Sequence, residues 1–208
     1  MAKNLVNVEQ VSKAFDINSL LTRVSIGISE NDRIGIVGRN GGGKSTLVKI
    51  LAGLIQPDSG KVSRSNSTIF GILNQVDFLD PKTKVSEYVL EGVNEHEWAR
   101  NSHSREVLHG LFGLEAKKML NREFASLSGG EKRRASIAKL LIKPLNLILL
   151  DEPTNHLDVE GVAWLAKYLR ERKNLAVVVI THDRWFLDEV SESMWEVIDG
   201  SVEEYDGG

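Results

Sequence analysis

Cysteine is absent from the 208 residues of the chain. Its absence excludes a disulfide framework, a metal site built from thiolates and a thiol nucleophile. No apolar run approaches the roughly 18 residues that span a bilayer, and no repeat or low-complexity linker interrupts the sequence. The net charge of −3, from 26 basic and 29 acidic residues, lacks the basic excess typical of nucleic-acid-binding domains. Contact with RNA would therefore depend on a local patch or on a segment outside this sequence.

The chain does contain enough apolar sequence for a core. With 41% hydrophobic and 26% charged residues, its composition is typical of a globular protein. Its length fits one domain, or one domain with a small added lobe. The first residues lead directly into a strand-like pattern, so we expect no signal peptide and a cytoplasmic protein.

Apolar patterns predict an α/β fold. Near the N-terminus, Val24, Ile26 and Ile28 alternate with small or polar residues, which is typical of a half-buried strand. Residues 147–150 and 175–180 are uniformly apolar. Runs of this kind are typical of parallel strands that are covered on both faces.

Between these strands the sequence changes character. Residues 77–126 mix charged and small residues, and their apolar residues recur at helical spacing. We therefore expect a small helical lobe inserted in a single domain of residues 1–208, whose α/β body comprises residues 1–76 and 127–208.

The strongest chemical signal is the segment GRNGGGKS at residues 38–45. It matches the phosphate-binding loop G-x-x-x-x-G-K-[ST], in which glycines let backbone N–H groups surround the phosphates. A helical pattern follows the loop, so the positive end of a helix would also face the ligand. We expect Lys44 to reach the β- and γ-phosphates and Ser45 to ligate Mg²⁺. The candidate nucleotide contacts of this segment are Gly38, Arg39, Asn40, Gly41, Gly42, Gly43, Lys44, Ser45 and Thr46.

An acidic pair, Asp151 and Glu152, ends the first uniformly apolar run. The carboxyl ends of parallel strands face the ligand crevice of α/β proteins. We expect Asp151 to hold Mg²⁺ through water and Glu152 to act as the general base toward the attacking water. The polar turn at residues 153–158 argues against a merely solvated strand end.

His182 follows the second apolar run, at the same predicted edge of the sheet. A lone histidine is a weak signal, but the nearby loop and acidic pair favour a contact with the γ-phosphate or with the attacking water. His96, His103 and His109 lie in the polar lobe, where we expect them to be exposed. His156 lies in the turn after the acidic pair.

The segment Ser-Gly-Gly-Glu at residues 128–131 allows two interpretations. It is an S-x-x-E capping box at the start of a helix. Ser128, Gly129 and Gly130 also leave the N-terminus of that helix open to a phosphate.

The glycine loop, LSGGE at residues 127–131 and LILLDE at residues 147–152 together resemble the ATPase domain of the ATP-binding cassette (ABC) superfamily. The resemblance covers nearly the whole chain. It implies a P-loop fold with a mostly parallel core sheet, an antiparallel β subdomain and the inserted helical lobe. It also implies an ATPase that uses ATP and Mg²⁺.

The resemblance further assigns roles that the residues alone do not. It implies that Ser128, Gly129 and Gly130 grip ATP held by a second cassette, which completes the active site. Phe15 matches the aromatic residue that stacks on adenine, although the sequence alone also allows a core or edge phenylalanine. Gln75 matches the glutamine that contacts Mg²⁺ and the attacking water.

Two segments indicate one family within the ABC superfamily. TNHLD at residues 154–158 and RWFLD at residues 184–188 are similar to the ABC-F family, soluble twin-cassette ATPases that act on the ribosome. This implies that the chain is the first of two cassettes, with a linker and a second cassette after Gly208. The stretch between Gln75 and Ser128 has no room for the long arm that many ABC-F first cassettes carry.

Two alternatives stay open. In the first, the chain is the ATP-binding subunit of an ABC membrane transporter, and the helical lobe would bind a membrane partner. It also fits a clamp that closes on nucleotide with negligible hydrolysis. The ABC-F segments argue against the transporter, and Glu152 and His182 argue against the clamp.

Overall fold

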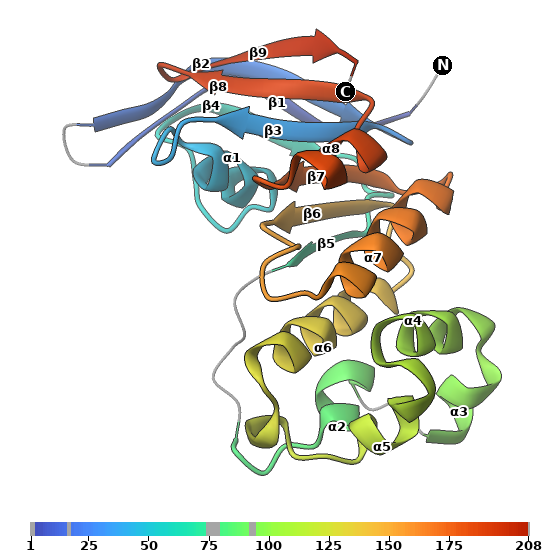
Figure 1. Ribbon diagram of the computed structural model, residues 1–208. Coiled ribbons are helices and arrows are strands. Elements are labelled where there is room, and N and C mark those ends of the chain that lie inside the picture. The colour runs from blue at the N-terminus through green and yellow to red at the C-terminus, as the bar shows by residue number, and fades with distance from the viewer. Residues whose placement is uncertain (1–2, 16–17, 74–79, 92–94, 208) are drawn as a thin grey trace. The chain divides into compact units, whose positions relative to one another are not determined.

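The computed structural model describes residues 3–15, 18–73, 80–91 and 95–207. They form two compact units (Figure 1). The first comprises Met1–Ile72, Leu145–Pro153 and Ala166–Gly208, and the second Leu73–Pro144 and Thr154–Leu165. The second unit therefore contains the predicted lobe, residues 77–126, together with residues 73–76, 127–144 and 154–165.

The first unit contains a three-stranded antiparallel sheet in the order β2-β1-β4. Its strands are β1 (Asn4–Phe15), β2 (Asn18–Ser29) and β4 (Ser59–Arg64). The alternation predicted in β2 is confirmed, because Val24, Ile26 and Ile28 are buried and the residues between them are exposed.

A bulge interrupts β1 at Gln10, which has a positive φ of 49°. Around it the register shifts against both β2 and β4, and pairing with β4 resumes only between Ser12 and Ser59. The Gln10 backbone N–H and side-chain amide both donate to Ser25 Oγ, at 3.0 and 2.9 Å. Bulges bend a strand and redirect its side chains. Further register shifts follow between Val11 and Ala14, and β1 ends with the pair Phe15–Asn18.

The second sheet of this unit has six strands in the order β5-β6-β7-β3-β8-β9. They are β5 (Phe70–Leu73), β6 (Leu147–Asp151), β7 (Ala176–Ile180), β3 (Arg33–Gly38), β8 (Ser193–Ile198) and β9 (Ser201–Asp206). Strands β6, β7, β3 and β8 are parallel, and β9 is antiparallel to β8. The carboxyl ends of β3, β6 and β7 consequently meet at one edge of the sheet (Figure 1).

Among its described residues, the first unit contains the helices α1 (Lys44–Leu51) and α8 (Arg184–Val190) and the C-terminal part of α7 (Val159–Glu171). Arg33, at the start of β3, is buried and donates from Nη2 to the carbonyl oxygen of Arg172 at 2.6 Å. That carbonyl lies just after α7, where a helix leaves acceptors without partners inside the helix. Arg33 thus ties the end of α7 to the central strand.

The second unit is helical. Its elements are α2 (Val85–Leu90), α3 (Glu95–Arg100), α4 (Ser102–Phe112), η1 (Gly113–Glu115), α5 (Ala116–Leu120), η2 (Phe124–Ser126), α6 (Gly129–Leu141) and the first residues of α7. Tyr88 packs against Phe124, with ring centroids 4.6 Å apart, and its hydroxyl lies 3.2 Å from Ser136 Oγ. A Cβ at Gly110 would lie 1.9 Å from Trp164, so α4 approaches α7 where only glycine fits.

One expectation in this unit is wrong. His103 is partly buried rather than exposed, and its Nε2 lies 2.8 Å from the carbonyl oxygen of Leu141, the last residue of α6. The ring of His103 is therefore placed by a contact with a different helix, which spacing along the chain does not reveal. Among the residues described, no helix combines the length and the apolar character that crossing a membrane requires.

Candidate nucleotide-binding site

The glycine loop joins β3 to α1, as its sequence predicts. Gly38 and Gly43 have positive φ values of 137° and 103°. A Cβ at Gly38 would lie 2.4 Å from the carbonyl oxygen of Val197, and one at Gly43 would lie 2.9 Å from that of Leu20. Both the backbone conformation and the close approach therefore require glycine at these two positions.

Lys44 is the first residue of α1 and is 8% exposed. Its ammonium group donates to the carbonyl oxygens of Gly38 and Arg39, at 2.7 and 3.0 Å. An ammonium group has three N–H donors, so the third can serve a phosphate oxygen. Lys44 thus links both ends of the glycine loop by hydrogen bonds and places a positive charge within the loop.

Glu152 and His182 follow the neighbouring strands β6 and β7. Glu152 Oε1 lies 3.5 Å from His182 Nε2, and the Glu152 N–H donates to the carbonyl oxygen of Ile180 at 2.8 Å. The φ of Glu152 is 48°, in the left-handed region that is unfavourable for residues other than glycine. Such strain costs on the order of 1–3 kcal/mol and concentrates at functional sites.

These groups share one cavity of about 240 Å³ within the first unit. Nine of the sequence-predicted site residues line it: Asn40, Gly41, Gly43, Lys44, Ser45, Thr46, Asp151, Glu152 and His182. Leu20 and Ile180 line it as well, although no sequence motif places either residue at the site. The β3–β7 and β6–β7 pairings bring the three segments together, and no local pattern encodes them.

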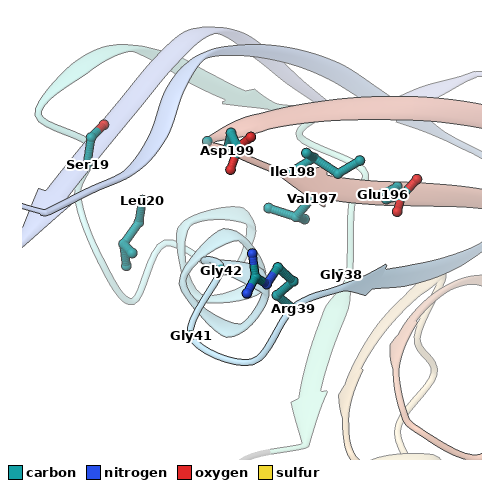
Figure 2. A pocket seen from close by; sticks show the side chains of 11 residues that line it. Ser19, Leu20, Gly38, Arg39, Gly41, Gly42, Glu196, Val197, Ile198 and Asp199 are labelled. Carbon is teal, nitrogen blue, oxygen red and sulfur yellow. The ribbon is translucent and has the colours of Figure 1, made fainter.

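A second cavity, of about 870 Å³, lies between the glycine loop and the β8–β9 turn. Gly38, Arg39 and Gly42 line this cavity, and Gly41 borders both. Figure 2 shows the Arg39 side chain on the side of the loop that faces Val197 and Asp199. The predicted contact residues of the loop therefore divide between two cavities.

Phe15 ends β1 and is 46% exposed, so it is not a core residue. Lys13 lies over its ring, with Nζ 5.4 Å from the ring centroid. An exposed aromatic ring of this kind is available for stacking on a base. The predicted contact at Gln75 falls outside the described residues.

Ser128 begins α6 with the predicted capping box. Ser128 Oγ accepts the Glu131 N–H at 3.3 Å, and Glu131 Oε2 accepts the Ser128 N–H at 2.8 Å. The hydrogen bond from the Ser128 N–H is the main cause that lowers the pKa of Glu131. A Cβ at Gly130 would lie 2.8 Å from the carbonyl oxygen of His156, so glycine is also required there for packing. Ser128, Gly129 and Gly130 all belong to the second unit.

The chain matches the family model described as ABC transporter over residues 21–155. It is 35% identical to the energy-dependent translational throttle protein EttA of Haemophilus influenzae, over 100% of this chain and 37% of that protein. It is 34% identical to ABC transporter F family member 5 of Arabidopsis thaliana, over 99% of this chain and 29% of that protein. The chain therefore spans between a quarter and two fifths of the length of these relatives.

Among solved structures, the dimeric bacterial ABC transporter cassette MJ0796 has a TM-score of 0.81 and is 26% identical, with 97% of this chain and 98% of that chain covered. This likeness confirms the predicted fold class, with its largely parallel core sheet and antiparallel subdomain. From the family match, the fold and the shared cavity, we conclude that the chain belongs to the ABC family and is a nucleotide-binding ATPase cassette.

Proposed function

We propose that the chain is one cassette of a cytoplasmic ABC-F ATPase that works with a second cassette on the ribosome. The observation that carries the catalytic part is the cavity shared by Lys44, Asp151, Glu152 and His182. The translational role is supported by the printed names of the EttA and ABC F relatives. The TNHLD and RWFLD segments support it further.

The glycine loop would hold the triphosphate. Its backbone N–H groups and the N-terminus of α1 provide donors and positive charge, and Lys44 adds a buried ammonium group. Ser45 and Asp151 line the same cavity with a hydroxyl and a carboxylate, and oxygen ligands of this kind suit Mg²⁺. Mg²⁺ would neutralise charge on the β- and γ-phosphates.

Glu152 would accept the proton of the attacking water, and His182 would orient that water or the γ-phosphate. The 3.5 Å between their side chains brings both within reach of one small ligand. By resemblance, Gln75 would contact the same water and Mg²⁺, and Phe15 would stack on adenine. Stacking on an aromatic ring contributes about 1–3 kcal/mol.

A second cassette would supply the missing side of the site. Ser128, Gly129 and Gly130 would contact the γ-phosphate of ATP bound to the opposite cassette, through the N-terminus of α6. The dimeric state of MJ0796 supports such a pairing. Hydrolysis would then reopen the two cassettes and time the stay on the ribosome.

The test is cosedimentation with ribosomes. The full-length protein carrying Glu152→Gln, with the matching change in any second cassette, is loaded with ATP and centrifuged with ribosomes. We expect cosedimentation that depends on ATP, and none for Lys44→Ala, which should not bind ATP. A protein that retains ATP but never cosediments would contradict the ribosomal role.

The second candidate is the ATP-binding subunit of a membrane transporter. The likeness to the MJ0796 transporter cassette favours it. ATP hydrolysis that rises only with a membrane partner, and never with ribosomes, would support this candidate.

A further inference from the structure

Asp58 contacts three consecutive residues near the end of β1, from Ser12 to Ala14. Its backbone N–H donates to the carbonyl oxygen of Ser12 at 2.9 Å. Its carboxylate accepts the Lys13 ammonium group at 2.6 Å and the Ala14 N–H at 2.8 Å. These contacts begin where the ladder between β1 and β4 stops, after the pair Ser12–Ser59. On the side of β4, Asp58 therefore takes the place of strand pairing, while on the other side Lys13, Ala14 and Phe15 still pair with β2.

Lys13 continues this arrangement to the ring of Phe15. Its side chain is only 15% exposed, and its Nζ lies over the Phe15 ring, 5.4 Å from the centroid. A cation within about 6 Å of an aromatic face is attracted to it. Lys13 is thus held between the Asp58 carboxylate and the ring, while the ring is still 46% exposed.

The charge state of Asp58 agrees with this geometry. The hydrogen bonds from Lys13 and then from the Ala14 N–H lower the pKa of the Asp58 carboxyl. The group is therefore ionised at neutral pH, the state that the ion pair with Lys13 requires.

We propose that Asp58 is a positioning residue for the nucleotide base. Through Ala14 and Lys13 it fixes the direction of the Phe15 ring, and so the strength of ATP binding, without touching the nucleotide itself. This inference rests on the proposed stacking of Phe15 on adenine. It adds a residue from the turn before β4 to a site otherwise built from strand ends and the glycine loop.

The test compares two ligands on the 208-residue chain by calorimetry: Mg-ATP, and inorganic triphosphate, which has no base. Phe15→Ala should weaken ATP binding roughly 5- to 150-fold, the equivalent of about 1–3 kcal/mol of stacking. Asp58→Ala should weaken it roughly 3- to 10-fold, because the ring is present but no longer directed. Affinity for triphosphate should not change in either variant.

Two further variants separate the contacts of Asp58. Asp58→Asn can still accept the Ala14 N–H but loses the ion pair, so its affinity for ATP should lie between those of the native chain and Asp58→Ala. Lys13→Met keeps the apolar stem and loses the charge, and should behave like Asp58→Asn. Asp32→Ala is the matched control, because Asp32 also accepts a backbone N–H, from Ser29 at 2.6 Å, in the turn between β2 and β3. It should leave both affinities unchanged.

The outcomes distinguish this inference from the proposed function. Equal loss of ATP and triphosphate affinity in Asp58→Ala would overturn it, because the defect would then lie in the phosphate loop. A base-dependent loss in Phe15→Ala with none in Asp58→Ala would also overturn it and leave the stacking role intact. If Phe15→Ala left the affinity for ATP unchanged, Phe15 would have no stacking role, and the inference about Asp58 would fail as well.

Discussion

Glu152 Oε1 lies 3.5 Å from His182 Nε2, and the two residues follow the adjacent parallel strands β6 and β7. The backbone N–H of Glu152 donates a hydrogen bond to the carbonyl oxygen of Ile180. The β6–β7 pairing fixes this distance, because Asp151 is in register with Ile180. The two side chains consequently lie beside the same small cavity. Their relationship underlies the first prediction.

Glu152→Gln should slow ATP hydrolysis by roughly 10²- to 10⁴-fold, the usual contribution of a general base, while ATP binding is retained. The amide occupies the same space but cannot accept the proton. Phosphate release under steady-state conditions, measured with the partner cassette present, provides the test. Unchanged turnover would remove Glu152 from its assigned role, and Lys44→Ala serves as the control that loses binding.

Ser128→Asp should separate the two interpretations of the α6 N-terminus. Aspartate caps helices as well as serine does, so the free energy of unfolding should change by less than about 1 kcal/mol. Its negative charge would, however, repel a γ-phosphate approaching from the opposite cassette. We expect a stable chain whose ATP-dependent dimerisation is lost, as measured by analytical ultracentrifugation. Retained dimerisation would leave the capping box as the whole role of the residue.

Gly110→Ala should destabilise the second unit. The new methyl group would lie 1.9 Å from Trp164, a contact that forces α4 and α7 apart. Overpacking of this kind costs about 1–3 kcal/mol, which urea denaturation followed by tryptophan fluorescence can measure. Gly27→Ala is the matched control, because its Cβ would lie 3.4 Å from Asn4 Nδ2, an ordinary contact. Equal stability of the two variants would contradict the packing described for Gly110.

Arg33→Met should lower the free energy of unfolding by about 1.5–3 kcal/mol, because the Arg172 carbonyl loses a charged donor. Nucleotide affinity should not change, since Arg33 begins β3 and the glycine loop follows its other end. Lys49→Met, at an exposed position of α1, provides the comparison. A drop in ATP affinity without loss of stability would show that Arg33 acts on the site.

Much of the fold and site is predictable because the signals are local. The glycine loop, the alternation in β2 and the capping box at Ser128 each depend on residues within about one turn of helix or one strand. Nearby residues decide those conformations, so a single sequence contains them. The uniformly apolar runs likewise predict parallel strands, but not which strands are neighbours.

What the sequence leaves undetermined depends on distant parts of the chain. Asp58 and Leu20 carry no motif. Asp58 contacts Ala14 because the turn before β4 returns to the end of β1, and Leu20 lines the smaller cavity because β2 passes the glycine loop. His103 is misassigned for the same reason, because its partner at Leu141 lies on another helix. The division of the loop between two cavities likewise depends on β8, which is paired with β3 from far along the chain.

The left-handed backbone of residue 152 also bears on how such a cassette changes over evolutionary time. Glycine and asparagine adopt this conformation more readily than glutamate does. Replacement by either would relieve strain and, under the proposed function, would also remove the general base, so drift at this position would run towards a more stable protein with less turnover. Selection for turnover must therefore oppose selection for stability at residue 152. A cassette retained only for nucleotide-dependent association would be expected to have lost its glutamate there first.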